Sequence, residues 1–148
     1  MKKVRSGGFM MSKIHQLAGR IFNRLLKKYG IEELNSAQGR IMFTLWEKNN
    51  ISISELSERT QLEKSTLTGM LDRLEKDGFI ERVPSKEDRR KILIRSFDKN
   101  LSYREKFVKV SDEMLSMYYK DFTSAEIDVF EKNLERILNN LLEAENEG

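Results

Sequence analysis

The feature that most constrains this chain is a pair of short helical segments separated by a tight turn. Ser52 and Glu55 have the spacing of a capping box, in which each side chain bonds the backbone amide of the other residue. The pattern predicts a helix over residues 52–60 and, after the turn 61–63, a second helix over 64–76 that ends at Gly78. Two short helices joined by about three residues indicate a helix-turn-helix unit.

A two-stranded hairpin is expected directly after this unit. Residues 80–84 and 91–97 are rich in β-branched and apolar side chains, and six polar residues separate the two runs. Pro84 has no amide hydrogen to donate, which places it at a strand end or edge. We expect this hairpin to be the sole β structure in a mainly α-helical chain.

The segments that precede the helix-turn-helix are also predicted to be helical. Apolar residues at helical spacing predict a helix over 12–29, and Gly30 followed by Ile31 is the pattern of a Schellman motif at a helix end. Asn35 and Gln38 have capping-box spacing, so another helix should begin there.

The C-terminal segments are predicted to be long, amphipathic helices. The first starts at about residue 98, and the second starts at a capping box formed by Thr123 and Glu126. The second has ~23 residues and so a length of ~35 Å, whereas a compact chain of this size has a radius of gyration of only ~15 Å. One protomer can hardly cover the apolar stripe of that helix, which predicts a partner chain. The stripe consists of Ile127, Phe130, Leu134, Ile137, Leu138 and Leu141.

Composition excludes several classes of function. The chain has no cysteine and one histidine, so neither a disulfide, a thiolate metal site nor a histidine-based triad can form within it. The sequence offers no nucleophile–base pair, metal-ligand spacing or glycine-rich phosphate loop, and we expect neither an enzyme nor a cofactor. No run approaches the ~20 apolar residues of a membrane span. We expect a soluble, cytoplasmic protein without a membrane partner.

Positive charge is concentrated in two places. Residues 1–50 hold 10 Lys and Arg against 3 Asp and Glu, and residues 82–95 hold 6 against 2, although the whole chain carries only +3. A local basic focus suits a polyanionic partner. On the first helix the strip of Arg20, Arg24, Lys27 and Lys28 fits a solvated face, with extra phosphate contacts or membrane association as alternatives.

The helix predicted over 64–76 has two distinct faces. One carries leucines and a methionine at core spacing, and the other carries small or hydroxyl-bearing side chains. A helix that enters the major groove of DNA needs such short side chains, with hydroxyls and cations for base edges and phosphates. The alternative is an ordinary solvated face. The outward residues are Ser65, Thr68, Gly69 and Asp72, flanked by Lys64 and Arg73.

The hairpin tip carries the second basic cluster, which comprises Lys86, Arg89, Arg90 and Lys91. A two-stranded hairpin holds its tip away from the body of a protein, and Asp88 stands where it can hold the Arg90 guanidinium in one geometry. An arginine presented in this way fits a narrow, electronegative minor groove beside the helix in the major groove. The alternative is a solvated charged turn.

The stretch SELSERTQLEKSTLTGMLDRLEKDGFIERVPSKEDRRKILI, which contains Asp88-Arg89-Arg90, resembles the helix, recognition helix and wing of the MarR family. The resemblance implies a homodimeric winged helix-turn-helix repressor or regulator, and we expect it to bind a pseudo-palindromic operator in duplex DNA. It implies an N-terminal dimerisation helix (1–34), a DNA-binding lobe (35–98) and C-terminal dimerisation helices (99–148). Ser65, Thr66, Thr68 and Arg73 match the family's DNA-contacting positions, and Arg90 matches its minor-groove arginine.

The resemblance also implies a small aromatic or phenolic effector that releases DNA. We expect its cleft near His15, Trp46 and Tyr118. The family often has Leu-Thr-x-x-Gly after the wing, whereas residues 96–100 here read Ser-Phe-Asp-Lys-Asn, so Asp98 is expected to cap the next helix. The family's cysteine-based peroxide sensing is excluded. The alternative function is a winged-helix protein-interaction module without sequence-specific DNA binding.

Overall fold

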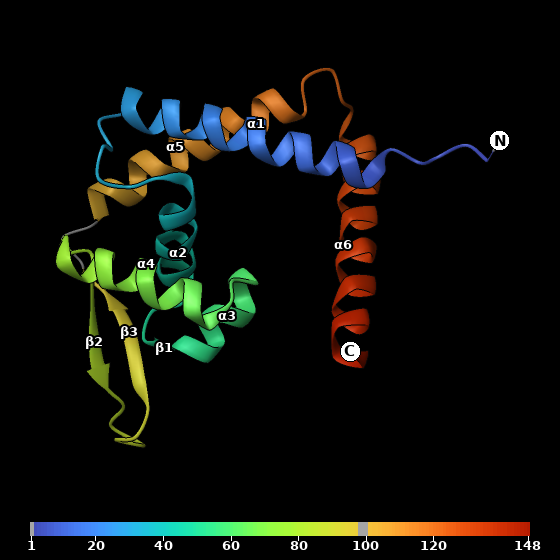
Figure 1. Ribbon diagram of the computed structural model, residues 1–148. Coiled ribbons are helices and arrows are strands. Elements are labelled where there is room, and N and C mark those ends of the chain that lie inside the picture. The colour runs from blue at the N-terminus through green and yellow to red at the C-terminus, as the bar shows by residue number, and fades with distance from the viewer. Residues whose placement is uncertain (1, 98–100) are drawn as a thin grey trace. The chain divides into compact units, whose positions relative to one another are not determined.

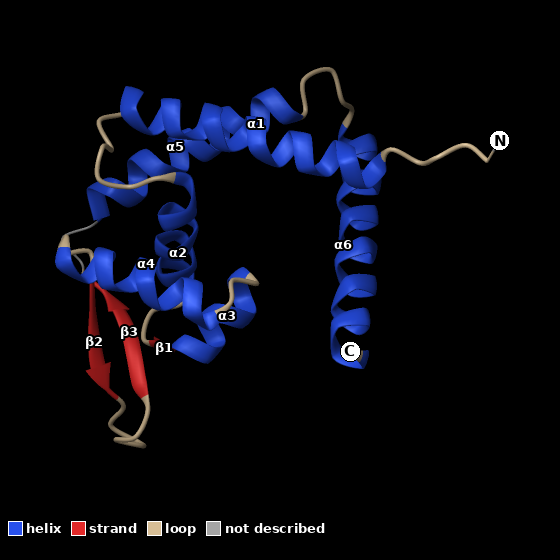
Figure 2. Ribbon diagram, viewed as in Figure 1, coloured by secondary structure: helices blue, strands red, loops and turns tan. Residues whose placement is uncertain are grey.

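The computed structural model describes residues 2–97 and 101–148. The chain forms two compact units, Met1–Asp112 and Glu113–Gly148, and α5 contributes to both. The expected fold class is confirmed, because the described residues are mainly helical with one small sheet (Figures 1 and 2). In chain order the elements are α1 (Gly7–Lys28), α2 (Ser36–Glu47), β1 (Ile51–Ser52), α3 (Ile53–Thr60), α4 (Lys64–Lys76), β2 (Ile80–Pro84), β3 (Ile92–Ser96), α5 (Leu101–Tyr118) and α6 (Ser124–Glu147).

Helix α1 begins earlier than its apolar spacing predicted and ends as predicted. It starts at Gly7 instead of residue 12, and the amide of Met10 already donates to the Ser6 carbonyl at 2.8 Å. Two glycines disfavour a helix by propensity alone, which concealed this start. At the other end Gly30 has φ +76°, and the Ile31 amide donates to the carbonyl of Leu26 at 2.8 Å. The Schellman motif is therefore confirmed.

The caps of α2 and α3 follow the sequence with one exception. The reciprocal box of Asn35 and Gln38 is present at α2. At α3 the Ser52 hydroxyl accepts from the Glu55 amide at 3.1 Å, but the Glu55 carboxylate pairs instead with Lys48 at 3.1 Å and Arg59 at 3.0 Å. A charged partner outcompetes a neutral amide for a carboxylate. The hydrogen bond from Lys48, and to a smaller extent that from Arg59, holds the pKa of the Glu55 carboxyl below its usual value.

The sheet has one strand more than expected. The hairpin of β2 and β3 is confirmed, with Arg82 opposite Ile94, although β3 starts one residue later and ends one residue earlier than predicted. Strand β1 then pairs with β3 through Ile51 and Ile94, so the order is β1-β3-β2. The expectation of a lone hairpin is wrong, because a two-residue strand is too short to show a period of its own. The predicted cap at Asp98 lies outside the described residues.

An aromatic cluster joins α1, α2 and α5 within the first unit. The ring of Phe107 is 3% exposed and lies 5.2 Å from that of Phe22 and 5.7 Å from that of Trp46, measured between centroids. Gly39 on α2 allows this ring to lie directly against the helix backbone, since a Cβ there would stand 2.2 Å from the Phe107 Cε2 atom. The absence of a side chain at Gly39 is therefore a packing requirement.

In the second unit, α6 begins at the predicted capping box of Thr123 and Glu126. The Tyr119 hydroxyl donates to the Glu131 carboxylate at 2.6 Å, and this bond, together with the partial loss of solvent around the hydroxyl, raises the pKa of Tyr119 to about 12. None of the 24 residues of α6, all of them described, is buried. Its exposed apolar residues include Phe130, Leu134, Ile137, Leu138 and Leu141.

Gly39→Ala should destabilise the protein by about 1–3 kcal/mol, because the new methyl group must displace a ring held by three aromatic neighbours. The matched control is Gly69→Ala on α4, where a Cβ would meet nothing within 4 Å. That change should raise the free energy of unfolding by about 0.5–1 kcal/mol through helix propensity. Urea titrations followed by circular dichroism measure both. Equal effects of the two substitutions would contradict the packing role of Gly39.

Candidate nucleic-acid interface

The two faces of α4 are separated as the sequence predicted. Leu67, Leu71 and Leu74 are buried, and Met70 is half-buried at the edge of the same face. The side chains expected to contact DNA, namely Lys64, Ser65, Thr66, Thr68 and Arg73, are all exposed. The outward face therefore presents small residues between two cations, and Gly69 among them leaves the backbone open to close approach.

The first turn of α4 keeps backbone donors available. Glu63 occupies the N-cap position, and its side chain makes no capping hydrogen bond. Uncapped amides at a helix N-terminus suit a phosphate. The Thr68 hydroxyl donates to the Lys64 carbonyl at 2.9 Å, so this side chain has its methyl group and oxygen lone pairs left for a partner.

The hairpin tip, here called the wing tip (residues 85–91), is a compact turn. The Ser85 amide donates to the Lys91 carbonyl and the Lys91 amide donates to the Asp88 carbonyl, both at 2.9 Å. The Ser85 hydroxyl accepts from the amides of Glu87 and Asp88 at 3.3 Å. Ser85 is buried, and sequence reasoning missed its role because a serine in a polar run carries no distinctive signal. This turn holds the tip residues in a defined arrangement.

Asp88 braces Arg90 in the way its spacing suggested. One carboxylate oxygen of Asp88 accepts from the Arg90 amide at 3.1 Å and from its Nε at 3.3 Å. The Arg90 side chain is nevertheless 92% exposed, so the guanidinium is oriented without being covered. Lys86, Arg89 and Lys91 are exposed around it. The hairpin carries this cationic tip away from the helices (Figure 1).

Arg82, at the base of the hairpin, was not singled out by the sequence. Its Nη1 donates to Glu75 and its Nη2 to Asp72, each at 2.8 Å, and its backbone amide donates to the second oxygen of Glu75 at 3.1 Å. The signal that could have indicated it is a pair of acids three residues apart on a helix, followed closely by an arginine in a strand. This contact joins α4 to β2.

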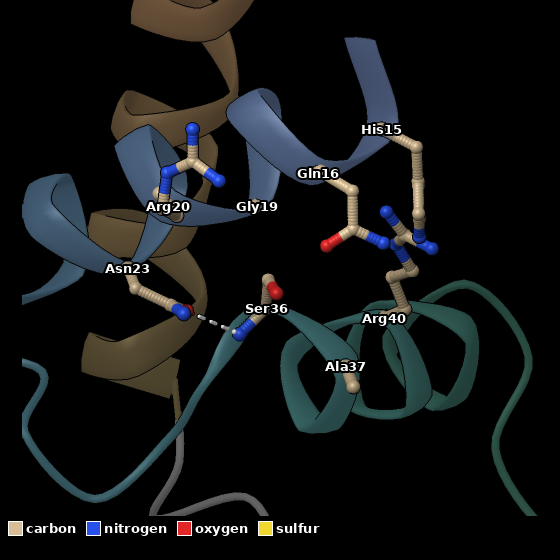
Figure 3. Close-up of a pocket in the computed structure, with 8 residues that line it drawn as sticks. All are labelled: His15, Gln16, Gly19, Arg20, Asn23, Ser36, Ala37 and Arg40. Carbon is tan, nitrogen blue, oxygen red and sulfur yellow. Dashed lines mark hydrogen bonds between the residues drawn. The ribbon is translucent and has the colours of Figure 1, made fainter. Parts of the chain in front are cut away.

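A cavity of about 270 Å³ lies between α1 and α2 (Figure 3). The amide of Ser36 donates to the Asn23 side chain at 2.8 Å across the gap between the two helices. Two arginines, Arg20 and Arg40, give the cavity a cationic lining. The remaining lining residues are His15, Gln16, Gly19, Asn23, Ser36 and Ala37.

Of the three residues expected near an effector, His15 lines this cavity. Trp46 does not line it and packs edge-to-face on Phe107 in the aromatic cluster of the first unit. Tyr118 belongs to the second unit, where its ring lies 6.4 Å from that of Tyr119. Arg20 and Arg40 were not predicted as ligand contacts, and only their common place in the lining of the cavity identifies them.

Metal-binding clusters and membrane-spanning helices are both absent from the described residues. Among those residues, no cluster of three or more histidine, aspartate or glutamate side chains has a geometry that could hold a metal ion. None of the described helices is long and apolar enough to cross a membrane.

A helix-turn-helix followed by a basic hairpin, with the small-residue face of α4 exposed, defines the winged helix-turn-helix class. Residues 34–92 match the model of the MarR family. The HTH-type transcriptional repressor IacR of Pseudomonas putida is 29% identical over 133 residues, which are 90% of this chain and 78% of that protein. Over these residues the chain is similar to MarR-family transcriptional regulators, which agrees with the expected family and with the expectation that the chain is not an enzyme.

Solved structures show the same fold. A MarR variant from E. coli, crystallised in complex with operator DNA, is similar with a TM-score of 0.79 and 24% identity over 88% of this chain and 92% of that one. The PcaV regulator of Streptomyces coelicolor, in complex with its natural ligand, has a TM-score of 0.80 and 21% identity over 94% and 98% of the two chains.

Proposed function

We propose that this protein represses transcription by binding a pseudo-palindromic operator as a homodimer, with α4 in the major groove and the wing tip in the flanking minor groove. The observation that carries the proposal is the braced, exposed guanidinium of Arg90 beside a helix whose outward face is small and hydroxyl-bearing. The proposed DNA contacts are Lys64, Ser65, Thr66, Thr68 and Arg73 on α4, and Lys86, Asp88, Arg89, Arg90 and Lys91 on the wing.

Exposed apolar side chains on α1 and α6 support a dimer. On α6, Leu138 is 48% and Leu141 63% exposed, and on α1 Phe9 is 69% exposed. Covering such side chains contributes about 25 cal/mol per Å² of apolar surface. In this proposal residues 1–34 and 99–148 build the dimer and residues 35–98 bind DNA. Two copies related by a two-fold axis would place two recognition helices in major grooves about 34 Å apart. In this proposal the protein lies in the cytoplasm.

We also propose that a small aromatic or phenolic acid binds the cavity between α1 and α2 and releases the DNA. The cavity volume of about 270 Å³ exceeds the roughly 150 Å³ of a protein cavity that holds one benzene ring, and Arg20 and Arg40 supply the charge that a carboxylate needs. The relative PcaV was crystallised with a natural ligand, which supports a ligand site in this fold. Of the three residues expected near an effector, His15 alone lines this cavity and keeps a proposed role there.

Arg90→Ala should weaken binding to the operator by about 1–3 kcal/mol and reduce the preference for AT-rich flanks, because the minor-groove contact is lost. Arg104→Ala, an exposed arginine on α5, is the control and should have little effect. Fluorescence anisotropy over a range of salt concentrations, with a duplex selected by the protein and a scrambled duplex, measures both. If the two duplexes dissociate at the same salt for the wild type, the protein-interaction alternative gains support.

Leu138→Asp should raise the dissociation constant of the dimer by at least about tenfold, since the interface would bury an unpaired carboxylate. The matched control, Asn139→Asp, adds the same charge outside the apolar stripe of α6 and should leave the dimer intact. Sedimentation velocity at several protein concentrations gives both constants. A Leu138→Asp protein as dimeric as the wild type would exclude α6 from the interface.

A hydroxybenzoate that binds the cavity at tenfold excess over its Kd should stabilise the protein by about 1.4 kcal/mol, which corresponds to a rise of about 3–5 °C in Tm. Arg40→Gln should abolish this rise, whereas Arg24→Gln, outside the cavity, should preserve it. Differential scanning fluorimetry against a panel of hydroxybenzoates provides the measurement. A ligand-induced shift that survives Arg40→Gln would place the ligand elsewhere.

A further inference from the structure

Arg82 occupies the point where the recognition helix meets the wing. Its guanidinium is shared between two carboxylates of α4, Asp72 and Glu75, which lie three residues apart on one side of that helix. Both ion-pair distances are 2.8 Å, and the Arg82 side chain is 21% exposed, much less than the tip arginine Arg90. A planar, two-pronged guanidinium fixes direction as well as distance.

The backbone of Arg82 takes part in the same contact. Strand β2 is an edge strand, because β3 separates it from β1. The Arg82 amide points to the open edge and donates to Glu75 at 3.1 Å. One glutamate side chain thus satisfies both the strand backbone and the arginine side chain, and α4 is docked on the edge of the hairpin. We name these three residues, Asp72, Glu75 and Arg82, the wing clamp.

We propose that Arg82 is a positioning residue for DNA recognition, and that the wing clamp sets the angle between α4 and the wing so that both grooves are reached together. The inference rests on the proposed function. From Arg82 to Ser85 the strand spans about 10 Å, so a rotation of about 10° at the clamp moves the wing tip by roughly 2 Å. The minor groove is only about 6 Å wide. A loosened clamp would therefore misplace Arg90 without changing any residue that touches DNA.

The negative charge of Glu75 allows an experiment to distinguish a positioning effect of the clamp from a purely electrostatic one. Glu75→Gln removes one negative charge beside the proposed DNA-binding face, so electrostatics alone would tighten binding to every duplex. If the clamp positions the wing, the same substitution would instead weaken binding to a duplex that the wing helps to recognise. Asp77→Asn is the matched control. It removes the same charge at the C-terminal end of α4, whereas the ion pairs that Arg82 makes with described residues of α4 are to Asp72 and Glu75.

In anisotropy titrations, Glu75→Gln should weaken binding to a duplex selected from a random library by about three- to tenfold, while binding to a scrambled duplex stays constant or tightens. Asp77→Asn should weaken neither. In an Arg90→Ala background the effect of Glu75→Gln on the selected duplex should fall below about twofold, because the minor-groove contact that the clamp positions is already absent. Equal losses in both backgrounds, or tighter binding to both duplexes, would overturn the positioning role.

A second measurement reports on the clamp without DNA. The chain has no cysteine, so spin labels at Glu58→Cys on α3 and Glu87→Cys on the wing tip are unique within a protomer. In protein diluted with unlabelled chains, the distance distribution between these labels should broaden in both Arg82→Lys and Glu75→Gln and stay narrow in Asp77→Asn. An unchanged distribution in the clamp variants would overturn the inference. A wild type that does not distinguish the two duplexes would instead refute the proposed function.

Discussion

Burial of Leu67, Leu71 and Leu74 against the rest of the first unit fixes the rotation of α4 about its own axis. Each of these side chains is at most 1% exposed, and full burial of a leucine stabilises a fold by about 1.5–3 kcal/mol. Turning the helix by one residue, about 100°, would expose this row and bury polar or charged side chains such as Thr68, Asp72 and Glu75 in its place. The outward direction of Ser65 and Thr68 is therefore a consequence of core packing, and the surface proposed to contact DNA is as stable as the core beneath it.

Helix caps and helix ends were predictable from the sequence, whereas contacts between distant segments were not. The boxes at Asn35 and Thr123 and the glycine-ended helices depend on residues within one turn of each other, so their spacing suffices. Strand β1 exists only because β3, more than forty positions later, offers it a partner. The ion pairs of the wing clamp could not be predicted for the same reason. Asp72 and Glu75 on α4 meet Arg82 on β2 only because the chain reverses direction between the two elements. Residue types thus predicted which side chains of α4 and the wing tip are exposed, but not the contacts that orient the wing.

Helix α2 connects the parts of the molecule that the proposed mechanism requires to communicate. Its first turns line the cavity through Ser36, Ala37 and Arg40. Just beyond its C-terminal end, the Asn49 side chain accepts from the Ser96 amide at 2.8 Å and donates to the Ser96 carbonyl at 3.3 Å, which fastens it to the end of β3. A helix of 12 residues transmits a displacement over about 18 Å with little bending. A ligand that shifts the start of α2 would therefore act on the base of the wing.

Folding also converts a neutral stretch of sequence into a polarised surface. Residues 51–98 contain as many acidic as basic side chains, so bulk charge does not attract this segment to DNA. In the structure many of its acids are engaged by neighbouring cations: Glu55 by Lys48 and Arg59, Asp72 and Glu75 by Arg82, Glu81 by Arg95, and Asp88 by Arg90. These pairs contribute little stability at a solvated surface, but they keep carboxylates from repelling phosphates beside Lys64, Lys86, Arg89 and Lys91. The affinity for a polyanion then depends on where the cations stand, and hence on the packing of α4 and the geometry of the hairpin.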